Sequence, residues 1–310
     1  MKSNLRFTVA ILSASLLAFI LPDAIVNVAG FETKKLIIPL LMVIMFGMGT
    51  HLAFRDFIEV SKQPKAVILG IGLQFIVMPV TGALLALFSQ LPAEIAAGII
   101  LVGCSPSGLA SNVMCFIAKA NLALSVTLTT FATLIAPLVT PFLMQLLAGE
   151  YVEVNPISML LTMLKLVIFP VVGGMLFHHI VPARFARVFD VMPLVSMLGI
   201  ILIVAIIIAN GQQALVNMGW LLLGVVLVHN TLGFLLGYTG AKLAKLDEAS
   251  CRTLAFEVGM QNSGLASGLA LHMNKVATMG LAAALFSSVQ NITGSLMAAF
   301  WSQTDKQPTT

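Results

Sequence analysis

Ten long apolar runs follow one another along this chain, with only short polar connections between them. A helix needs roughly 20 mostly apolar residues to cross a bilayer. Hydrophobic residues make up 59% of the chain and charged residues 9%, against about 25% charged in a soluble domain. The sequence therefore predicts an all-α polytopic membrane protein, with membrane lipid as its solvent. We expect spans near residues 6–21, 36–54, 65–89, 93–118, 121–148, 156–179, 191–209, 218–241, 249–273 and 276–301.

The pentapeptide Ser-Gly-Leu-Ala-Ser occurs twice, at Ser107–Ser111 and at Ser263–Ser267, 156 residues apart. Each copy places glycine and small polar residues inside a long apolar run. Interrupted segments at corresponding positions of two halves indicate the binding region of a secondary transporter. Five spans per half force the second half to insert upside down. We expect two inverted five-helix repeats, residues 1–150 with spans 1–5 and residues 151–310 with spans 6–10, and breaks in helices 4 and 9.

Basic residues indicate the orientation, because cytoplasmic loops are enriched in Lys and Arg. With the amino terminus inside, twelve lie in inner segments and three in outer loops, so both termini are predicted to be cytoplasmic. The apolar run after Arg6 is interpreted as a first span and not as a signal peptide. Basic residues that flank spans give no reason to expect nucleic acid. The twelve are Lys2, Arg6, Arg55, Lys62, Lys65, Lys119, Arg184, Arg187, Lys242, Lys245, Arg252 and Lys306, and the outer three are Lys34, Lys35 and Lys275.

One acidic residue, Glu257, falls inside a predicted span, while the other eleven lie in loops or at span ends. An ionisable group inside the membrane costs several kcal/mol and is a functional candidate by default. The alternative is a structural carboxylate paired with Lys165, the one basic residue inside a span. A carboxylate without a basic partner favours a metal cation or a proton.

Oxygen-bearing side chains cluster near Glu257 in the predicted helices. Ser125 and Thr129 share one helical face because they are four residues apart, Gln261 follows Glu257 by four, and Ser111–Asn112 follow the first break. An interrupted helix also exposes backbone carbonyls, which is tolerated only where they are buried or line a cavity. Hard oxygen ligands of these kinds favour a hard cation such as sodium.

A half-helix is expected to begin after each break, near Ser107–Gly108 and near Asn262–Ser263. Helix amino termini favour anions because their N–H groups are free and the helix dipole is positive there. Sodium ligands beside two such ends indicate symport of an organic anion. Two sodium ions carried with one monoanion would make the transport electrogenic.

Three runs carry a specific resemblance: Gly103–Met114, Asn121–Val126 and Glu257–Ala266. They resemble those of the bile acid:sodium symporter family, and the chain is similar to bacterial homologues over nearly all of its length. The resemblance implies a bacterial inner-membrane protein of ten spans. Spans 1, 2, 6 and 7 would form a panel domain. Spans 3–5 and 8–10 would form a core domain in which broken spans 4 and 9 cross.

The same resemblance implies two sodium sites and a substrate cavity. Gln290 departs from some relatives, which carry histidine there. One sodium site would use Ser111, Asn112, Ser125, Thr129 and Glu257, and the second Gln74, Glu257 and Gln261 with the carbonyls of Val258 and Met260. The expected substrate-binding residues are Ser107, Gly108, Leu109, Asn262, Ser263, Gln290 and Asn291.

Three other classes of membrane protein are alternatives to a symporter. A sodium–proton antiporter is the main alternative, but such proteins carry paired intramembrane aspartates and no aspartate lies in a core span here. An intramembrane hydrolase needs a base near its nucleophile, and neither Cys104 nor Ser105 has a histidine at motif spacing. A passive channel fits the asymmetric oxygen cluster poorly. The sequence therefore predicts a monomeric transporter and not an enzyme.

Overall fold

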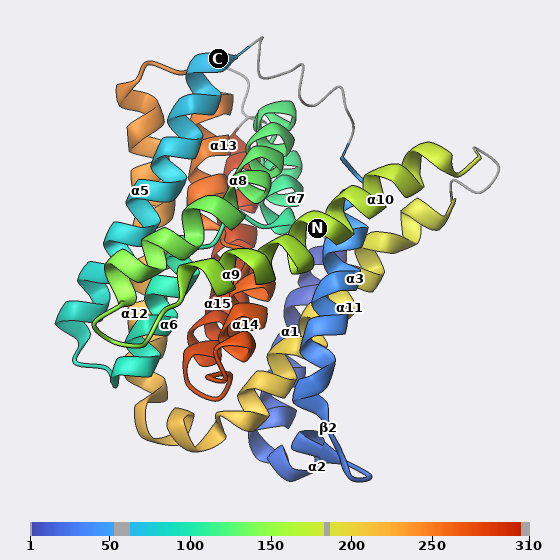
Figure 1. Ribbon diagram of the computed structural model, residues 1–310. Helices are drawn as coiled ribbons and strands as arrows, with labels where there is room; N and C mark the ends of the chain where they lie inside the picture. The colour runs from blue at the N-terminus through green and yellow to red at the C-terminus, as the bar shows by residue number, and fades with distance from the viewer. Residues whose placement is uncertain (1, 53–62, 183–186, 305–310) are drawn as a thin grey trace.

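The computed structural model describes residues 2–52, 63–182 and 187–304, and these form an almost entirely helical protein (Figure 1). Five of the described helices are long and apolar enough to cross a membrane: α5, α8, the continuous segment from α9 to α10, α11 and α12. The helices are α1 (Lys2–Ile20), α2 (Pro22–Val26), α3 (Ile37–Gly49), α5 (Pro64–Ser89), α6 (Ala93–Cys104), α7 (Leu109–Ile117), α8 (Leu122–Ala148), α9 (Pro156–Met163), α10 (Phe169–Ile180), α11 (Arg187–Asn210), α12 (Gln212–Leu243), α13 (Glu248–Gly259), α14 (Ser263–His272) and α15 (Met279–Thr304).

Each of the ten predicted apolar segments coincides with one helix or with helices joined end to end. The sequence did not predict the small antiparallel hairpin of β1 (Asn27–Val28) and β2 (Phe31–Glu32), whose turn contains Gly30 at φ +85°. It also did not predict η2 (Leu164–Ile168), a π-helical turn between α9 and α10. Pro170 follows this turn and lacks an N–H group, which disturbs the regular helical hydrogen bonding.

The helices pack in two groups. In the first group, α11 packs against α1 and α3, and α3 also packs against α10. In the second group, α12 packs against α5 and α13, while α5 also contacts α6 and α8. Figure 1 shows the first group on one side of the molecule and the second on the other. Helix α15 packs against α6 and α12 of the second group, and α14 contacts both α15 and α3 of the first group.

Local sequence explains why two of the segments are interrupted. α6 ends at Cys104 because Ser105, which precedes Pro106, is extended (φ −78°, ψ 153°), as a residue before proline tends to be. α13 ends at Gly259, and Asn262 begins α14 by accepting a hydrogen bond from the Leu265 amide at 3.0 Å. The side-chain oxygen of an N-cap residue stabilises a helix start in this way.

Polar contacts hold the distant ends of the two interrupted segments together. Glu94 at the start of α6 accepts hydrogen bonds from Lys275, just after α14, and from Thr278. Arg252 of α13 donates to the carbonyl of Ala118, just after α7, at 3.3 Å. The interrupted segments therefore contact each other near both ends.

Part of the basic-residue pattern can be located in the structure. Lys65 lies in the first turn of α5, Lys119 just after α7, and Lys242 in the last turn of α12. Four of the residues used to predict orientation lie outside the described residues: Arg55, Lys62, Arg184 and Lys306.

Candidate functional site

The two helix breaks meet inside the second helix group. Ser107 and Gln261 form an antiparallel bridge, in which the Gly108 amide donates to the Met260 carbonyl (3.3 Å) and the Asn262 amide to the Pro106 carbonyl (2.8 Å). Each break thereby supplies hydrogen-bond partners for backbone groups of the other, as backbone outside helices requires at membrane depth. The half-helix starts predicted near Ser107–Gly108 and Asn262–Ser263 match the observed caps, Gly108 and Asn262.

The carboxylate of Glu257 lies at the end of α13, 2% exposed, among four hydroxyl groups. Ser111 and Ser125 donate to Oε1, each at 2.6 Å. Ser107 donates to Oε2 at 2.7 Å, and Thr129 is within 2.9–3.1 Å of both oxygens. The hydroxyls come from the first break, α7 and α8, so three separate segments converge on one buried charge.

This cluster contains more oxygen contacts than its hydrogens can satisfy. The single hydroxyl hydrogen of Ser125 faces Glu257 Oε1 at 2.6 Å and Asn112 Oδ1 at 2.7 Å. The Thr129 hydroxyl faces both Glu257 oxygens and also Asn112 Oδ1 at 3.2 Å. With the Asn112 oxygen turned toward these hydroxyls, an orientation that is assigned from the bonds themselves, each single hydrogen makes one strong bond and lone pairs are left facing each other. A small hard cation would be coordinated by these lone pairs, and the donor set therefore fits sodium.

The charge of Glu257 has no basic partner among the described residues. Its side-chain partners are hydroxyls, and Lys165, the partner considered from the sequence, lies exposed on η2. Among the residues whose side-chain burial the structure describes, Glu257 is the only buried acidic one. A second buried carboxylate, which a paired-aspartate antiporter site would need, is not found among them.

The second predicted sodium set also comes together. Gln74 Nε2 donates to Gln261 Oε1 (2.8 Å) and to the Ser105 carbonyl (2.9 Å), while Gln261 Nε2 donates to the Val258 carbonyl (2.7 Å). The nitrogen and oxygen of a carboxamide are assigned from such bonds. A half-turn of both carboxamides would place the Gln261 oxygen beside the Val258 oxygen and the Gln74 oxygen beside the Ser105 oxygen, as cation binding there would require.

Two features of the second set differ from the first. The Met260 carbonyl accepts from Gly108, so it is engaged between the breaks. Among the described residues, the hydrogen-bond partners of the Glu257 side chain do not include Gln74 or Gln261. The sharing of Glu257 by both sodium sites therefore stays a prediction.

Side chains from α12 and α15 hold the second break in shape. Gln290 accepts from the Gln261 amide (2.7 Å) and donates to its carbonyl (3.0 Å). Asn230 donates to the Gly259 carbonyl (2.8 Å), and Thr293 donates to Asn230 (2.6 Å). Asn230 was not among the predicted site residues, because its place on a long helix does not reveal that it binds the unwound backbone.

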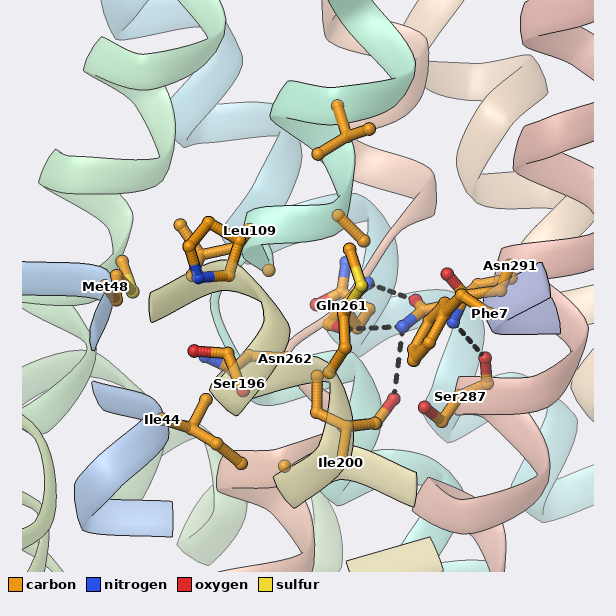
Figure 2. A pocket seen from close by; sticks show the side chains of 18 of the residues that line it. Phe7, Ile44, Met48, Leu109, Ser196, Ile200, Gln261, Asn262, Ser287 and Asn291 are labelled. Carbon is orange, nitrogen blue, oxygen red and sulfur yellow. Dashed lines mark hydrogen bonds between the residues drawn. The ribbon is translucent and has the colours of Figure 1, made fainter. Parts of the chain in front are cut away.

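A cavity of about 950 Å³, its open mouth included, separates the two helix groups beside the breaks. Figure 2 shows Leu109, Gln261 and Asn262 between Ile44, Met48 and Ser196 on one side and Ser287 and Asn291 on the other. None of the described residues that line it is charged. The lining consists of Phe7, Thr8, Ile44, Met45, Met48, Gly108, Leu109, Ala110, Val113, Met114, Pro193, Ser196, Met197, Ile200, Gln261, Asn262, Ser263, Gly264, Ser287, Gln290 and Asn291.

Six of the seven predicted substrate residues line this cavity: Gly108, Leu109, Asn262, Ser263, Gln290 and Asn291. The seventh, Ser107, does not line it, because its hydroxyl is directed at Glu257. Sequence reasoning did not single out the polar residues contributed by the opposite helix group, Thr8 and Ser196, or Ser287 on α15. The signal available for Ser196 was its place in an apolar run three residues after Pro193.

The sequence profile of the Sodium Bile acid symporter family matches residues 38–218. The sodium-dependent transporter YocS of Bacillus subtilis is 40% identical over 97% of this chain and 92% of its own length. An Arabidopsis thaliana chloroplast protein named "Probable sodium/metabolite cotransporter BASS1" is 34% identical over 84% of this chain and 65% of its own length. The human ileal sodium/bile acid cotransporter is 32% identical over 78% of this chain and 70% of its own length.

Proposed function

We propose that this chain, which belongs to the sodium bile acid symporter family, couples the inward movement of sodium to the uptake of an organic anion by alternating access. The family consists of sodium-dependent membrane transporters and not of enzymes, so sodium is a co-substrate here. Beyond family membership, we infer which residues bind sodium, that two ions are carried, and which kind of anion accompanies them. Bile acid-like molecules and small carboxylates are the substrate classes that we infer.

The oxygen cluster around Glu257 is the observation that carries the proposal. An ionised carboxylate buried without a basic partner is strongly disfavoured unless a cation balances it or a proton neutralises it, and the surrounding oxygens favour the cation. Ser111, Asn112, Ser125 and Thr129 supply the neutral oxygens of a first sodium site. Gln74, Gln261 and the Val258 and Met260 carbonyls would supply a second site that shares Glu257. Two sodium ions carry more charge than one monoanion, so the membrane potential would drive uptake at about 2.3 kcal/mol per net charge per 100 mV.

The character of the cavity supports an organic anion with a large apolar body. Its walls are mostly aliphatic, and its polar groups are hydroxyls and amides such as Ser196, Asn262 and Asn291. The starts of α7 and α14 both face it, through Leu109 and Ser263. Neutral donors and helix starts can hold a carboxylate without a basic residue. An anion held in this way is released more readily than one that is paired with a buried arginine.

The position of the cavity supports alternating access. Phe7 near the start of α1 and Met114 in the second half of α7 line it, and both lie toward the end of the bundle that we infer to be cytoplasmic. On the other side of the breaks, α14 packs on α3 and α9, and a Cβ at Gly268 would lie 2.4 Å from a Leu41 methyl. We therefore infer that the first helix group is the panel domain and the second group is the core domain. The ten spans would form two inverted repeats in a bacterial inner membrane. The protein would act as a monomer, with both termini in the cytoplasm.

Reconstitution in liposomes tests this function. We expect uptake of a labelled carboxylate to require an inward sodium gradient and to increase with an inside-negative potential. Affinity for the anion in sodium should exceed that in potassium by roughly 5–150-fold, and the anion should raise sodium affinity by the same factor. Equal anion affinities in the two salts would remove the coupling. Sodium-driven proton release without anion uptake would favour an exchanger instead.

Cysteine accessibility tests the mechanism separately. In a background that lacks Cys104, Cys115 and Cys251, a cysteine at position 262 should react from one side in potassium. It should react from the other side in sodium plus the anion. Labelling that is independent of sodium would contradict alternating access about the breaks.

A further inference from the structure

Thr133 of α8 is a buried residue whose hydroxyl has no hydrogen-bond partner in the described part of the chain. The side chain is 0% exposed. On the same helix, Thr127 and Thr130 donate to the carbonyls four residues earlier, at 2.8 and 2.7 Å. A helical threonine can satisfy its hydroxyl in this way, and a buried hydroxyl left without a partner is destabilising. Thr133 therefore presents a free oxygen inside the protein.

The main-chain carbonyl of Thr133 also lacks its usual donor. In a helix this oxygen would accept from the N–H group four residues later, which is position 137. That residue is Pro137, and proline has no N–H group. Two hard oxygen atoms of one buried residue, a hydroxyl and a carbonyl, are therefore left without their regular partners at the same point of α8.

Thr133 shares a face of α8 with two threonines whose partners are known. Residues four and seven apart lie on one side of a helix. Four residues earlier, Thr129 contacts Glu257, and seven residues later, Thr140 donates to the Cys104 carbonyl at the end of α6 (2.6 Å). Thr133 therefore lies along α8 between the Glu257 cluster and the first break.

The packing of α5 on α8 shows which part of α5 is level with Thr133. Asn121 donates to Gln63, and a Cβ at Gly70 would lie 2.6 Å from Leu128. Both pairs are 58 residues apart, so the two helices keep one register. The same offset places Gln74 opposite position 132, next to Thr133. Gln74 belongs to the second predicted sodium set, so Thr133 is about level with that set along α8 and one turn from Thr129 of the first set.

We propose that Thr133 is a further sodium ligand, whose hydroxyl and carbonyl oxygens form a cation position between the Glu257 site and the Gln74–Gln261 pair. The inference rests on the proposed function, because it concerns the path of the same co-substrate. Sodium is coordinated by oxygens of both kinds. A position there would let an ion move between the two sites while it keeps contact with oxygen ligands.

Sodium-induced thermal stabilisation of the purified full-length protein tests this, with potassium as the sodium-free reference. Thr133→Val keeps the shape and removes the hydroxyl. We expect its midpoint in potassium to equal or exceed that of the wild type, because an unpaired buried hydroxyl is lost. The sodium concentration for half-maximal stabilisation should rise about two- to tenfold, as expected for one lost hydroxyl contact. Thr133→Ser should restore the wild-type concentration.

Thr130→Val is the matched control, because Thr130 is equally buried on the same helix but its hydroxyl is bonded to Val126. Its sodium titration should follow the wild type. If Thr133→Val does not fold, Thr133→Ala compared with Thr133→Ser makes the same test. A Thr133→Val titration identical to the wild type would overturn the ligand role alone. A wild type that sodium does not stabilise would overturn this inference together with the proposed sodium sites.

Discussion

The two copies of Ser-Gly-Leu-Ala-Ser have identical sequences but different structures. In the first copy, Ser107 and Gly108 are extended and α7 begins at Leu109. In the second copy, α14 begins at Ser263, two positions earlier in the motif. The Ser111 hydroxyl consequently reaches Glu257, while the corresponding Ser267 hydroxyl bonds to the Ser263 carbonyl of its own helix. An identical motif thus contributes to the ion cluster in one half only.

The residue just before each copy accounts for the difference. Asn262 precedes the second copy and caps α14 by accepting from the Leu265 amide. Pro106 precedes the first copy and has no side-chain acceptor, so the helix cannot be capped there. A repeat therefore predicts where two breaks lie, while the flanking residue decides which side chains each break presents. Duplication has left two breaks that pair with each other and differ in chemistry.

The largest effect is expected at Glu257, the acidic residue near the end of α13, just before the second break. Glu257→Ala should abolish sodium binding and sodium-driven uptake, because it removes the charge that the surrounding hydroxyls and both proposed sites use. Isothermal titration with sodium measures this, and a size-exclusion profile that matches the wild type checks folding. Retention of two-sodium binding by the variant would refute the assignment.

Matched substitutions in the two copies would sharpen the comparison. Ser111→Ala removes a 2.6 Å bond to Glu257 and should weaken sodium binding by roughly tenfold, in line with 1.5–3 kcal/mol for a hydrogen bond to a charged group, discounted for replacement by water. Ser267→Ala removes a bond within α14 and should leave sodium affinity unchanged. Equal effects of the two substitutions on sodium titrations would show that the copies are functionally alike.

The amide pair should matter less than the carboxylate. Gln74→Ala or Gln261→Ala should weaken one sodium site and leave residual binding at the other, because neither side chain contacts the first cluster. The expected signature is a lower Hill coefficient for sodium in uptake assays. Complete loss of sodium binding in a folded Gln74→Ala protein would mean that the two sites are not separable.

The smallest effects are expected at the two motif glycines. A Cβ at Gly108 would lie 3.2 Å from the Gln261 carbonyl oxygen, so Gly108→Ala should destabilise by about 1 kcal/mol through crowding between the breaks. At Gly264, in the first turn of α14, the nearest atom would be 3.6 Å away. Gly264→Ala should therefore stabilise by about 0.4–1 kcal/mol. Thermal unfolding in potassium compares them, and destabilisation by both would contradict the difference in packing.

The helical membrane fold and the positions of the apolar segments followed from sequence, because burial in lipid requires long apolar runs whatever their partners are. The family followed from the three motif runs around the breaks and Glu257. The isolation of Glu257 was visible for the same reason: a carboxylate in such a run stands out. The hairpin after α2 and the π-helical turn η2 were not predicted. Both depend on short-range backbone geometry within segments whose hydrophobic pattern is ordinary.

The contacts within the candidate sodium sites and the cavity could not be predicted from apolar runs. Local sequence determined that α6 ends before Pro106 and that Asn262 starts α14, since prolines and caps act on neighbouring residues. Only the tertiary structure brought Ser107, Ser125 and Thr129 to the same two oxygens of Glu257, at separations of 128 to 150 residues. It also turned Ser107 from the cavity to the carboxylate and left Thr133 without a partner. Such long-range choices depend on how whole helices pack, and no short pattern in the chain encodes them.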